Sequence, residues 1–192
     1  GNDPASMRYV RNKIKDCQEV GIDGDVYAYP ENMTELELDD ELNHLQEFYD
    51  GVIVQLPLPP HIRSSIATAA ILPEKDVDGF HEQNVGALCV GSKGYVSCTP
   101  LGVIQLLKRS GIEIAGKRCV VLGRSNIVGK PMSMLLLREN GTVTVCHSRT
   151  ENIKEITKQA DILVVAIGKP KFVDDSYVKD GAVVIDVGIH RD

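Results

Sequence analysis

Hydrophobic residues in the second half of the chain fall into short runs separated by amphipathic segments. The runs with the length and composition of strands are 118–123, 142–146, 161–166 and 182–187. Segments 130–139 and 151–159, which lie between them, have helical composition. Alternating strands and helices indicate an α/β fold with a doubly wound parallel sheet.

The first half of the chain shows mainly helical patterns. The segments predicted to be helical are 6–20, 34–48, 62–72 and 99–110, the last with Thr99 as N-cap and Pro100 in its first turn. Residues 25–29 form a possible short strand, and a buried strand over 51–56 delivers Gln55 at its carboxyl end. Residues 84–97 are rich in glycine and are predicted to be an irregular connector or lid.

Composition excludes several classes of protein. The net charge of −6 argues against nucleic acid as the default partner, and no apolar stretch approaches the roughly 20 residues of a membrane span. The five cysteines contain no C-x-x-C pair, so we expect no disulfide framework, no zinc site and a reducing compartment. Asp76 and Asp78 superficially resemble a calcium loop, but the other ligands of such a loop are missing, and we predict no metal site.

A glycine turn follows the first strand of the second half. Gly123 and Gly129 bracket it, Ser125 stands where a dinucleotide fingerprint has its middle glycine, and the last glycine comes one residue late. Such a turn directs backbone N–H groups and a helix dipole toward an anion. An ordinary strand-turn-helix corner is the alternative interpretation.

The end of the second strand bears on the choice of cofactor. A carboxylate normally holds the ribose 2′-hydroxyl there, but residues 145–150 contain none. Ser148 and Arg149, with Arg124 from the glycine turn, are able to surround a 2′-phosphate instead. We therefore predict NADP rather than NAD.

Other polar residues have structural and functional interpretations. Tyr9 and Lys13 lie one helical turn apart, either as a solvated pair or as part of a site. Gln55 either binds a ligand or satisfies loose backbone groups. His147 is expected to fix the turn after the second strand, and Asp186 to support the loop after the last strand or to contact cofactor.

Several motifs together resemble the bifunctional methylenetetrahydrofolate dehydrogenase/cyclohydrolase family. They are Ser6-x-x-Tyr9-x-x-x-Lys13, Val54-Gln-Leu-Pro-Leu-Pro59, Pro73-Glu-Lys-Asp-Val-Asp-Gly79, Cys98-Thr-Pro100, Gly123-Arg-Ser-Asn-Ile-Val-Gly129, Cys146-His-Ser148 and Ile185-Asp-Val-Gly188. The resemblance spans nearly the whole chain. It implies two α/β domains around a cleft: a folate domain over 1–98 and a Rossmann-like NADP domain over 99–192.

The resemblance also implies roles for single residues. Lys13 becomes the catalytic proton-transfer group. Tyr9 stacks on or orients the folate, Gln55 hydrogen-bonds Lys13, and Asp78 accepts hydrogen bonds from the pterin ring, with Asp76 ranked second. The implied partners are tetrahydrofolate derivatives and a second copy of the chain, and the implied location is the cytoplasm or an organelle matrix.

Two family features are not found in the sequence: an N-terminal helix and strand, and a C-terminal loop and helix. We therefore expect that flanking sequence is missing at both ends. Two rival functions stay open at this point. One is a shikimate-dehydrogenase-like NADP oxidoreductase, which would not need Gln55 or the Tyr9 and Lys13 pair. The other is a nucleotide-binding module without catalytic activity.

Overall fold

The computed structural model describes residues 4–188 of the 192-residue chain. The chain divides into two compact units, one ending at Val77 and the other beginning at Asp78. This division follows backbone packing alone. The functional boundary expected between residues 98 and 99 stays a prediction.

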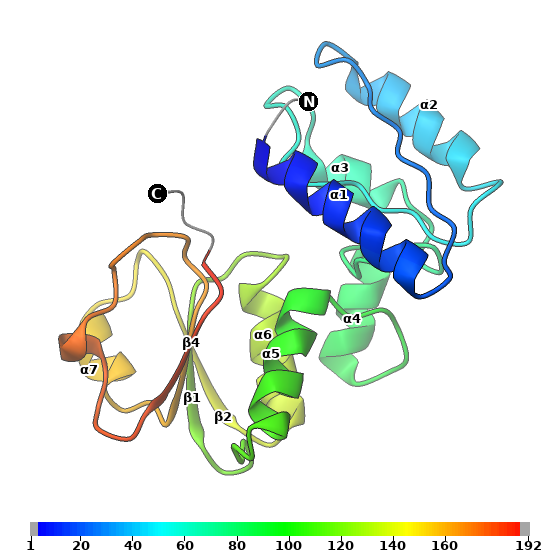
Figure 1. Cartoon of the computed structure of the whole chain (residues 1–192). Coiled ribbons are helices and arrows are strands. Elements are labelled where there is room, and N and C mark those ends of the chain that lie inside the picture. The colour runs from blue at the N-terminus through cyan, green and yellow to red at the C-terminus, as the bar shows by residue number, and fades with distance from the viewer. Residues whose placement is uncertain (1–3, 189–192) are drawn as a thin grey trace. The chain divides into compact units, whose positions relative to one another are not determined.

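The second unit is built on a four-stranded parallel sheet (Figure 1). Its strands are β1 (Arg118–Leu122), β2 (Thr142–Cys146), β3 (Ile162–Val165) and β4 (Val183–Asp186). Their spatial order is β2-β1-β3-β4, and each neighbouring pair is parallel. The predicted doubly wound sheet is confirmed, and the chain reverses its direction of winding between β1 and β3.

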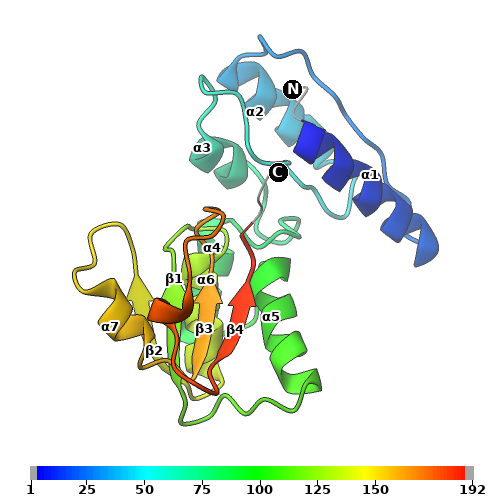
Figure 2. The ribbon, with the colours of Figure 1, turned by 60° about the vertical axis from the view of Figure 1, so that its left-hand side comes forward.

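Helices cover both faces of this sheet, as the edge-on view in Figure 1 and the face-on view in Figure 2 show together. The helices α4 (Glu82–Val90), α5 (Cys98–Arg109) and α6 (Gly129–Arg138) share one hydrophobic core with Cys119 and Val121 of β1. The helix α7 (Ile153–Thr157) packs on the opposite face, where Val120 and Leu122 point, and the 3-10 helix η1 (Asp175–Tyr177) contacts α7. Successive β1 side chains thus enter two different cores, and the expected double-sided burial of this strand is confirmed.

The first unit contains α1 (Pro4–Glu19), α2 (Glu35–Leu45) and α3 (Ser64–Ala69), and α2 and α3 pack around a smaller apolar core. Thr34 starts α2 with a capping box: its hydroxyl accepts from Glu37 N, and the Glu37 carboxylate accepts from Thr34 N at 2.7 Å. Val52 and Asp76 form an isolated parallel bridge.

Two strands predicted in the first half are not formed. Residues 25–29 form no strand, and side-chain hydrogen bonds join them to other segments: Tyr49 donates to Asp25 at 2.7 Å, and Tyr29 donates to Glu41 at 3.0 Å. Residues 51–56 pair only through the Val52 bridge. The buried apolar run that suggested a strand therefore contributes side chains to a core without joining a sheet.

Three predictions that concern helices were also wrong in part. Residues 84–97 were expected to be irregular, but most of α4 lies there, capped by the His81 side chain and ended by Gly91 at φ 79°. Leu88 anchors this helix in the core, which outweighs the low helix propensity of its glycine. The helix α5 begins at Cys98 with Ser97 in the N-cap position, so Thr99 is not the cap. The predicted helix over 62–72 is shorter, as α3.

Candidate functional site

The glycine turn (residues 123–129) lies at the carboxyl ends of β1, β2 and β3. Gly123 N donates to Cys146 O of β2 at 2.8 Å, and Ala166 N, just past β3, donates to Leu122 O at 2.7 Å. The φ of Gly123 is 121°, and a Cβ at this position would lie 2.4 Å from Ala166 O. Only glycine therefore fits between the two neighbouring strand ends.

The second glycine of the turn brings helix α6 against the first. A Cβ on Gly129 would lie 2.4 Å from Gly123 O and 2.8 Å from the Cα of Arg124. The first residue of α6 is thus in backbone contact with the turn. This close approach aims the amino end of α6 at the carboxyl edge of the sheet.

Ser125 explains why the middle glycine of a dinucleotide fingerprint is absent. Its Oγ accepts from the backbone N–H groups of Val128 and Gly129, both at 3.2 Å, and its carbonyl accepts from Lys130 N at 3.0 Å. The hydroxyl therefore caps the start of α6 and closes the turn in the way an N-cap does.

Four backbone N–H groups of the turn, those of residues 124–127, donate to no group within the described part of the chain. They lie at the positive end of the α6 dipole, beside the Lys130 ammonium, which donates to Asn126 Oδ1 at 2.7 Å. Consecutive free amides at a helix start form an anion cradle. This cradle suits the pyrophosphate of a dinucleotide.

The turn after β2 is held by His147 and Thr150. His147 N donates to Thr150 Oγ1 at 2.8 Å, Thr150 N donates to His147 O at 2.9 Å, and Arg149 N donates to His147 Nδ1 at 3.1 Å. These contacts bear out the expectation that His147 fixes this turn. The turn leaves Ser148 and Arg149 exposed.

Parallel pairing brings the two turns to one edge of the sheet. Leu122 and Cys146 are register partners, so residues 123–125 and 147–149 leave neighbouring strands side by side. Arg124, Ser148 and Arg149 are exposed there. Burial raises the pKa of the Cys146 thiol, so it is protonated at neutral pH and fills a core position.

Asp186 supports the loop that follows β4. Its Oδ1 accepts from Gly188 N at 2.8 Å, which is a local turn contact. This hydrogen bond supports the structural role expected for Asp186. A cofactor contact stays a prediction.

In the first unit, α1 carries Tyr9 and Lys13 one turn apart. Tyr9 is 43% exposed and Lys13 is half-buried. Gln55 follows the buried residues Val52 and Val54, and its Nε2 donates to Leu56 O at 2.9 Å. Its Oε1 is buried and accepts no hydrogen bond, so the expected bond from Lys13 to Gln55 is not formed in this structure.

Unpaired buried side-chain atoms concentrate in the two N-terminal motifs. In the described residues these atoms are Ser6 Oγ and Gln55 Oε1, from the motifs that contain Lys13 and Gln55. A buried polar atom without a partner costs roughly 1–3 kcal/mol. Such atoms are expected where a polar ligand completes the hydrogen bonding.

Asp76 and Asp78 differ in environment although they are two residues apart. Asp76 is 2% exposed, and its backbone forms the bridge to Val52. Asp78 is half-buried and precedes Gly79, whose φ is 69°. The more accessible Asp78 carboxylate is the better placed of the two for a ligand.

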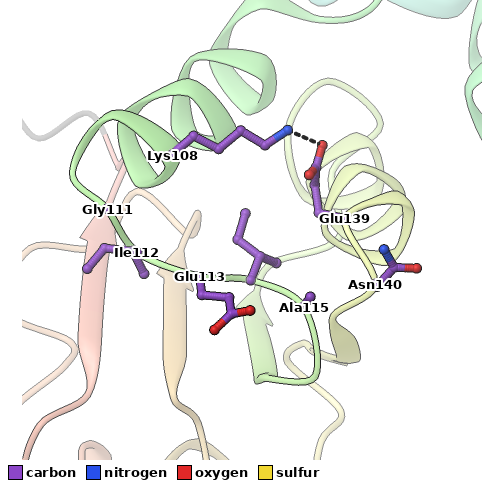
Figure 3. A pocket seen from close by; sticks show the side chains of 8 residues that line it. Lys108, Gly111, Ile112, Glu113, Ala115, Glu139 and Asn140 are labelled. Atoms are coloured by element: carbon purple, nitrogen blue, oxygen red, sulfur yellow. Dashed lines mark hydrogen bonds and ion pairs between the residues drawn. The ribbon is translucent and has the colours of Figure 1, made fainter.

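Two surface pockets lie away from the predicted site residues. One, of about 360 Å³, lies between the ends of α5 and α6, where Lys108 and Glu139 form a 2.7 Å ion pair (Figure 3). The other, of about 440 Å³, follows α1 and is lined by Gln18 and residues 21–25. Neither pocket is lined by a predicted site residue. The candidate site is therefore identified by the residues of the two turns and not by the pockets.

The described part of the chain has neither a candidate metal site nor a candidate membrane span. Residues 4–188 contain no group of three or more His, Cys, Asp or Glu side chains arranged to hold a metal ion. Within the same residues no helix has the length and apolar character to cross a membrane.

Two family models match the chain. Residues 1–78 match the catalytic domain of tetrahydrofolate dehydrogenase/cyclohydrolase, and residues 97–192 match the NAD(P)-binding domain of the same enzyme. The two matches together cover most of the chain and include the glycine turn.

Curated relatives are similar over the full chain. The Bifunctional protein FolD of Lachnoclostridium phytofermentans is 64% identical over 194 residues, covering 100% of this chain and 69% of that protein. The Bifunctional protein FolD of Acetivibrio thermocellus is 58% identical, covering 100% of this chain and 68% of that protein.

Solved structures give the same answer. The bifunctional FolD methylenetetrahydrofolate dehydrogenase/cyclohydrolase of Campylobacter jejuni superposes with a TM-score of 0.94 at 46% identity, covering 98% of this chain and 68% of that one. The Trypanosoma brucei enzyme, complexed with NADP cofactor and inhibitor, superposes with a TM-score of 0.92 at 43% identity, covering 98% and 65%. On this sequence and structural similarity, the chain belongs to the tetrahydrofolate dehydrogenase/cyclohydrolase family.

Proposed function

We propose that this chain oxidises 5,10-methylenetetrahydrofolate to 5,10-methenyltetrahydrofolate with NADP and then hydrolyses the product to 10-formyltetrahydrofolate. The observation that carries the proposal is the anion cradle of the glycine turn, formed between two glycines that no other residue can replace sterically. It occurs in a chain of the family whose models and solved structures carry both activities in their names.

We assign the two activities to two regions of the chain. Residues 1–98 form the folate domain and residues 99–192 the NADP domain in this proposal. The catalytic-domain match at 1–78 and the NAD(P)-binding match at 97–192 support it. The motif residues Tyr9, Lys13 and Gln55 then belong to the folate domain, and the glycine turn belongs to the NADP domain.

The cofactor residues follow from the two turns at the sheet edge. When bound, NADP supplies the hydride acceptor. Gly123, Ser125 and Gly129 shape the turn whose free amides hold the pyrophosphate. Arg124, Ser148 and Arg149 bind the 2′-phosphate, since no carboxylate stands at the end of β2 to repel it. The NADP complex of the Trypanosoma brucei relative supports this choice of cofactor.

The substrate residues act on the folate. Tyr9 stacks on or orients it, and Asp78 accepts hydrogen bonds from N–H donors of the pterin ring. Lys13 exchanges a proton with the water that adds to the methenyl cation. The unpaired Oε1 of Gln55 provides a buried acceptor for Lys13 or for the folate once substrate is bound.

Replacement of Lys13 tests the catalytic assignment. In Lys13→Ala we expect hydrolysis of methenyltetrahydrofolate to fall by about 10²-fold or more, because a positioned proton-transfer group typically contributes that much. Absorbance-monitored turnover follows reduced cofactor and methenyl intermediate separately. Unchanged hydrolysis in Lys13→Ala would overturn the role of Lys13, and NADP binding without any turnover in the wild type would favour the non-catalytic module.

Replacement of Arg124 tests the cofactor assignment. A charge-assisted contact to phosphate contributes about 1.5–3 kcal/mol, so Arg124→Ala should raise the KM for NADP by roughly 10- to 100-fold and leave the KM for NAD nearly unchanged. Arg138→Ala is the matched control, since Arg138 is an exposed arginine at the other end of α6. Equal losses for NADP and NAD would contradict the 2′-phosphate assignment.

We also propose a homodimer in the cytoplasm or an organelle matrix. The family resemblance supports both, and the five free cysteines suit a reducing compartment. Light scattering during size-exclusion chromatography tests the dimer. A monomeric mass at micromolar concentration would contradict it.

A further inference from the structure

One peptide unit of the glycine turn is held at both of its polar ends. The carbonyl of Ile127 accepts from Ser97 Oγ at 2.9 Å, and the N–H of Val128, which belongs to the same peptide, donates to Ser125 Oγ at 3.2 Å. This peptide directly follows the four free amides. Its orientation therefore fixes one end of the anion cradle.

The buried Ser97 hydroxyl donates to the Ile127 carbonyl and does not cap its own helix. It is 4% exposed and occupies the N-cap position of α5, where a serine side chain ordinarily accepts from the first helical N–H groups. Here the side chain makes no such cap. The hydroxyl instead donates across 30 residues of sequence to the tip of the glycine turn.

The segment before Ser97 is fixed on its other side by the turn that contains Asp78 and Gly79. A Cβ on Gly79 would lie 2.9 Å from Tyr95 O and 3.0 Å from Ser97 N, so the two backbones are in contact. Tyr95 N donates to Oδ1 of Asn84, which is buried, at 3.2 Å. Ser97 is therefore in contact both with the turn that follows Asp78 and with the glycine turn.

We propose that Ser97 is a positioning residue that holds the glycine turn in its anion-binding conformation and couples it to the turn at Asp78. The inference rests on the proposed function, in which the first turn binds NADP and Asp78 binds folate. Without the Ser97 hydroxyl, the peptide after Ile127 keeps one of its two hydrogen bonds, and cofactor binding has to order it. A ligand that orders one of the two turns lowers the cost of ordering the other, so folate and NADP each strengthen the binding of the other through this contact, by the same factor.

Ser97→Ala tests the inference in the full chain. Calorimetric titration with NADP, with and without tetrahydrofolate, gives two dissociation constants. Tetrahydrofolate lacks the methylene bridge and therefore does not react. We expect the NADP Kd of Ser97→Ala to rise by roughly 3- to 10-fold, as for one lost hydrogen bond. The factor by which tetrahydrofolate tightens NADP binding should fall toward one, with kcat changed less than KM.

Three further variants separate positioning from a general loss of stability. Ser97→Thr keeps the hydroxyl and should restore the wild-type Kd. Ser97→Cys keeps the buried volume but weakens the donor, so it should give a Kd between those of wild type and Ser97→Ala. Ser110→Ala removes the same group from the exposed other end of α5 and should change neither constant.

The outcomes are distinguishable from failure of the proposed function. Wild-type binding of NADP, combined with unchanged Kd and coupling factor in folded Ser97→Ala, overturns this inference alone. If Ser97→Ala does not fold, unchanged values in Ser97→Cys overturn it. A wild type in which tetrahydrofolate leaves the NADP Kd unchanged overturns the coupling. A wild type that binds neither NADP nor NAD overturns the proposed function itself.

Discussion

The two units of this chain are stabilised in different ways. In the second unit, β1 and β3 are buried on both faces, with Cys119, Val121 and Leu163 fully inaccessible. In the first unit a small core coexists with several large exposed apolar side chains, among them Val20 at 71% and Phe48 at 68%. Much of the first unit is instead tied together by side-chain hydrogen bonds.

The second unit fixes backbone geometry more tightly than the first. A parallel sheet with two cores sets backbone positions to within a fraction of an ångström, as the contacts of Gly123 and Gly129 require. Side-chain hydrogen bonds leave the backbone of the first unit more freedom to move than this packing does, because a single hydrogen bond contributes only about 0.5–1.5 kcal/mol. Binding of a rigid phosphate group suits the first kind of structure.

The largest effect on cofactor binding is expected from Gly123→Ala. The new Cβ would meet Ala166 O at 2.4 Å and needs a φ that alanine avoids, so β1, β3 or the turn has to move. We expect cofactor binding to weaken by about 10²-fold or more, because a shifted turn loses amide hydrogen bonds to the pyrophosphate, and hydrogen bonds to a charged group contribute about 1.5–3 kcal/mol each. Calorimetric titration with NADP measures it.

Gly102→Ala is the control for that prediction. Gly102 lies in α5, where a Cβ meets nothing within 4 Å, so alanine should stabilise the protein by roughly 0.5–1 kcal/mol and leave binding intact. If both glycine variants bound NADP like the wild type, the steric argument for the turn would be wrong.

Core truncation compares the two units directly. Leu136→Ala removes a fully buried side chain of α6 and should cost about 3–5 kcal/mol, whereas Leu38→Ala, at an 8% exposed position of α2, should cost about 2–3 kcal/mol. Leu137→Ala is the matched exposed control at 57%. Urea unfolding measures all three, and a greater cost for Leu38→Ala would reverse the comparison.

Gln46 tests whether polar ties hold the first unit. This residue is 4% exposed, its Nε2 donates to Leu42 O and Ala70 O at 3.0 Å, and its Oε1 accepts from Leu72 N. Gln46→Ala leaves buried backbone groups unpaired and should cost about 2–4 kcal/mol in urea unfolding.

An exposed glutamine provides the control for Gln46. Gln18→Ala, on the surface of α1, should stay within about 0.5 kcal/mol of the wild type. A Gln46→Ala variant as stable as Gln18→Ala would show that apolar packing alone holds the first unit.

The smallest effect concerns pH and the core of the second unit. Burial raises the pKa of the Cys119 thiol to about 11 from its ordinary 9.0. Because the folded pKa is the higher one, its contribution to stability is complete below pH 9 and is lost as the pH rises toward 11. At pH 10 the loss is about 1 kcal/mol. Urea unfolding of the wild type and of Cys119→Ala at pH 8 and pH 10 isolates the contribution of this thiol. If the free energy of unfolding fell equally with pH in both proteins, the prediction would be wrong.

The sheet and the glycine turn could be predicted from sequence because their signals are local. The apolar run that ends at Leu122 is buried, as expected for a strand inside a parallel sheet. Gly123 and Gly129 lie so close to neighbouring backbone atoms that no other residue fits at these positions. The observed limits of β2 match the predicted 142–146 because a turn residue bounds it on each side.

Features that depend on distant partners were missed. The helix α4 forms because Leu88 packs into a core made mostly of residues that come later in the chain. The Ser97 hydroxyl donates to the carbonyl of Ile127 in the glycine turn and does not cap its own helix. The signal for α4 was present as Gly91, which ends the helix in the left-handed region. No local pattern shows that Gln55 donates to Leu56 O while its Oε1 stays unpaired.

The Ser125 cap has a consequence for the exchange of amide hydrogens with solvent. The first N–H groups of a helix normally exchange quickly, since no carbonyl of the helix accepts from them. Here Val128 and Gly129 are held by a hydroxyl, whereas the amides of residues 124–127 are open. Protection from deuterium should therefore begin at Val128, and a bound dinucleotide should extend it backward by those four amides.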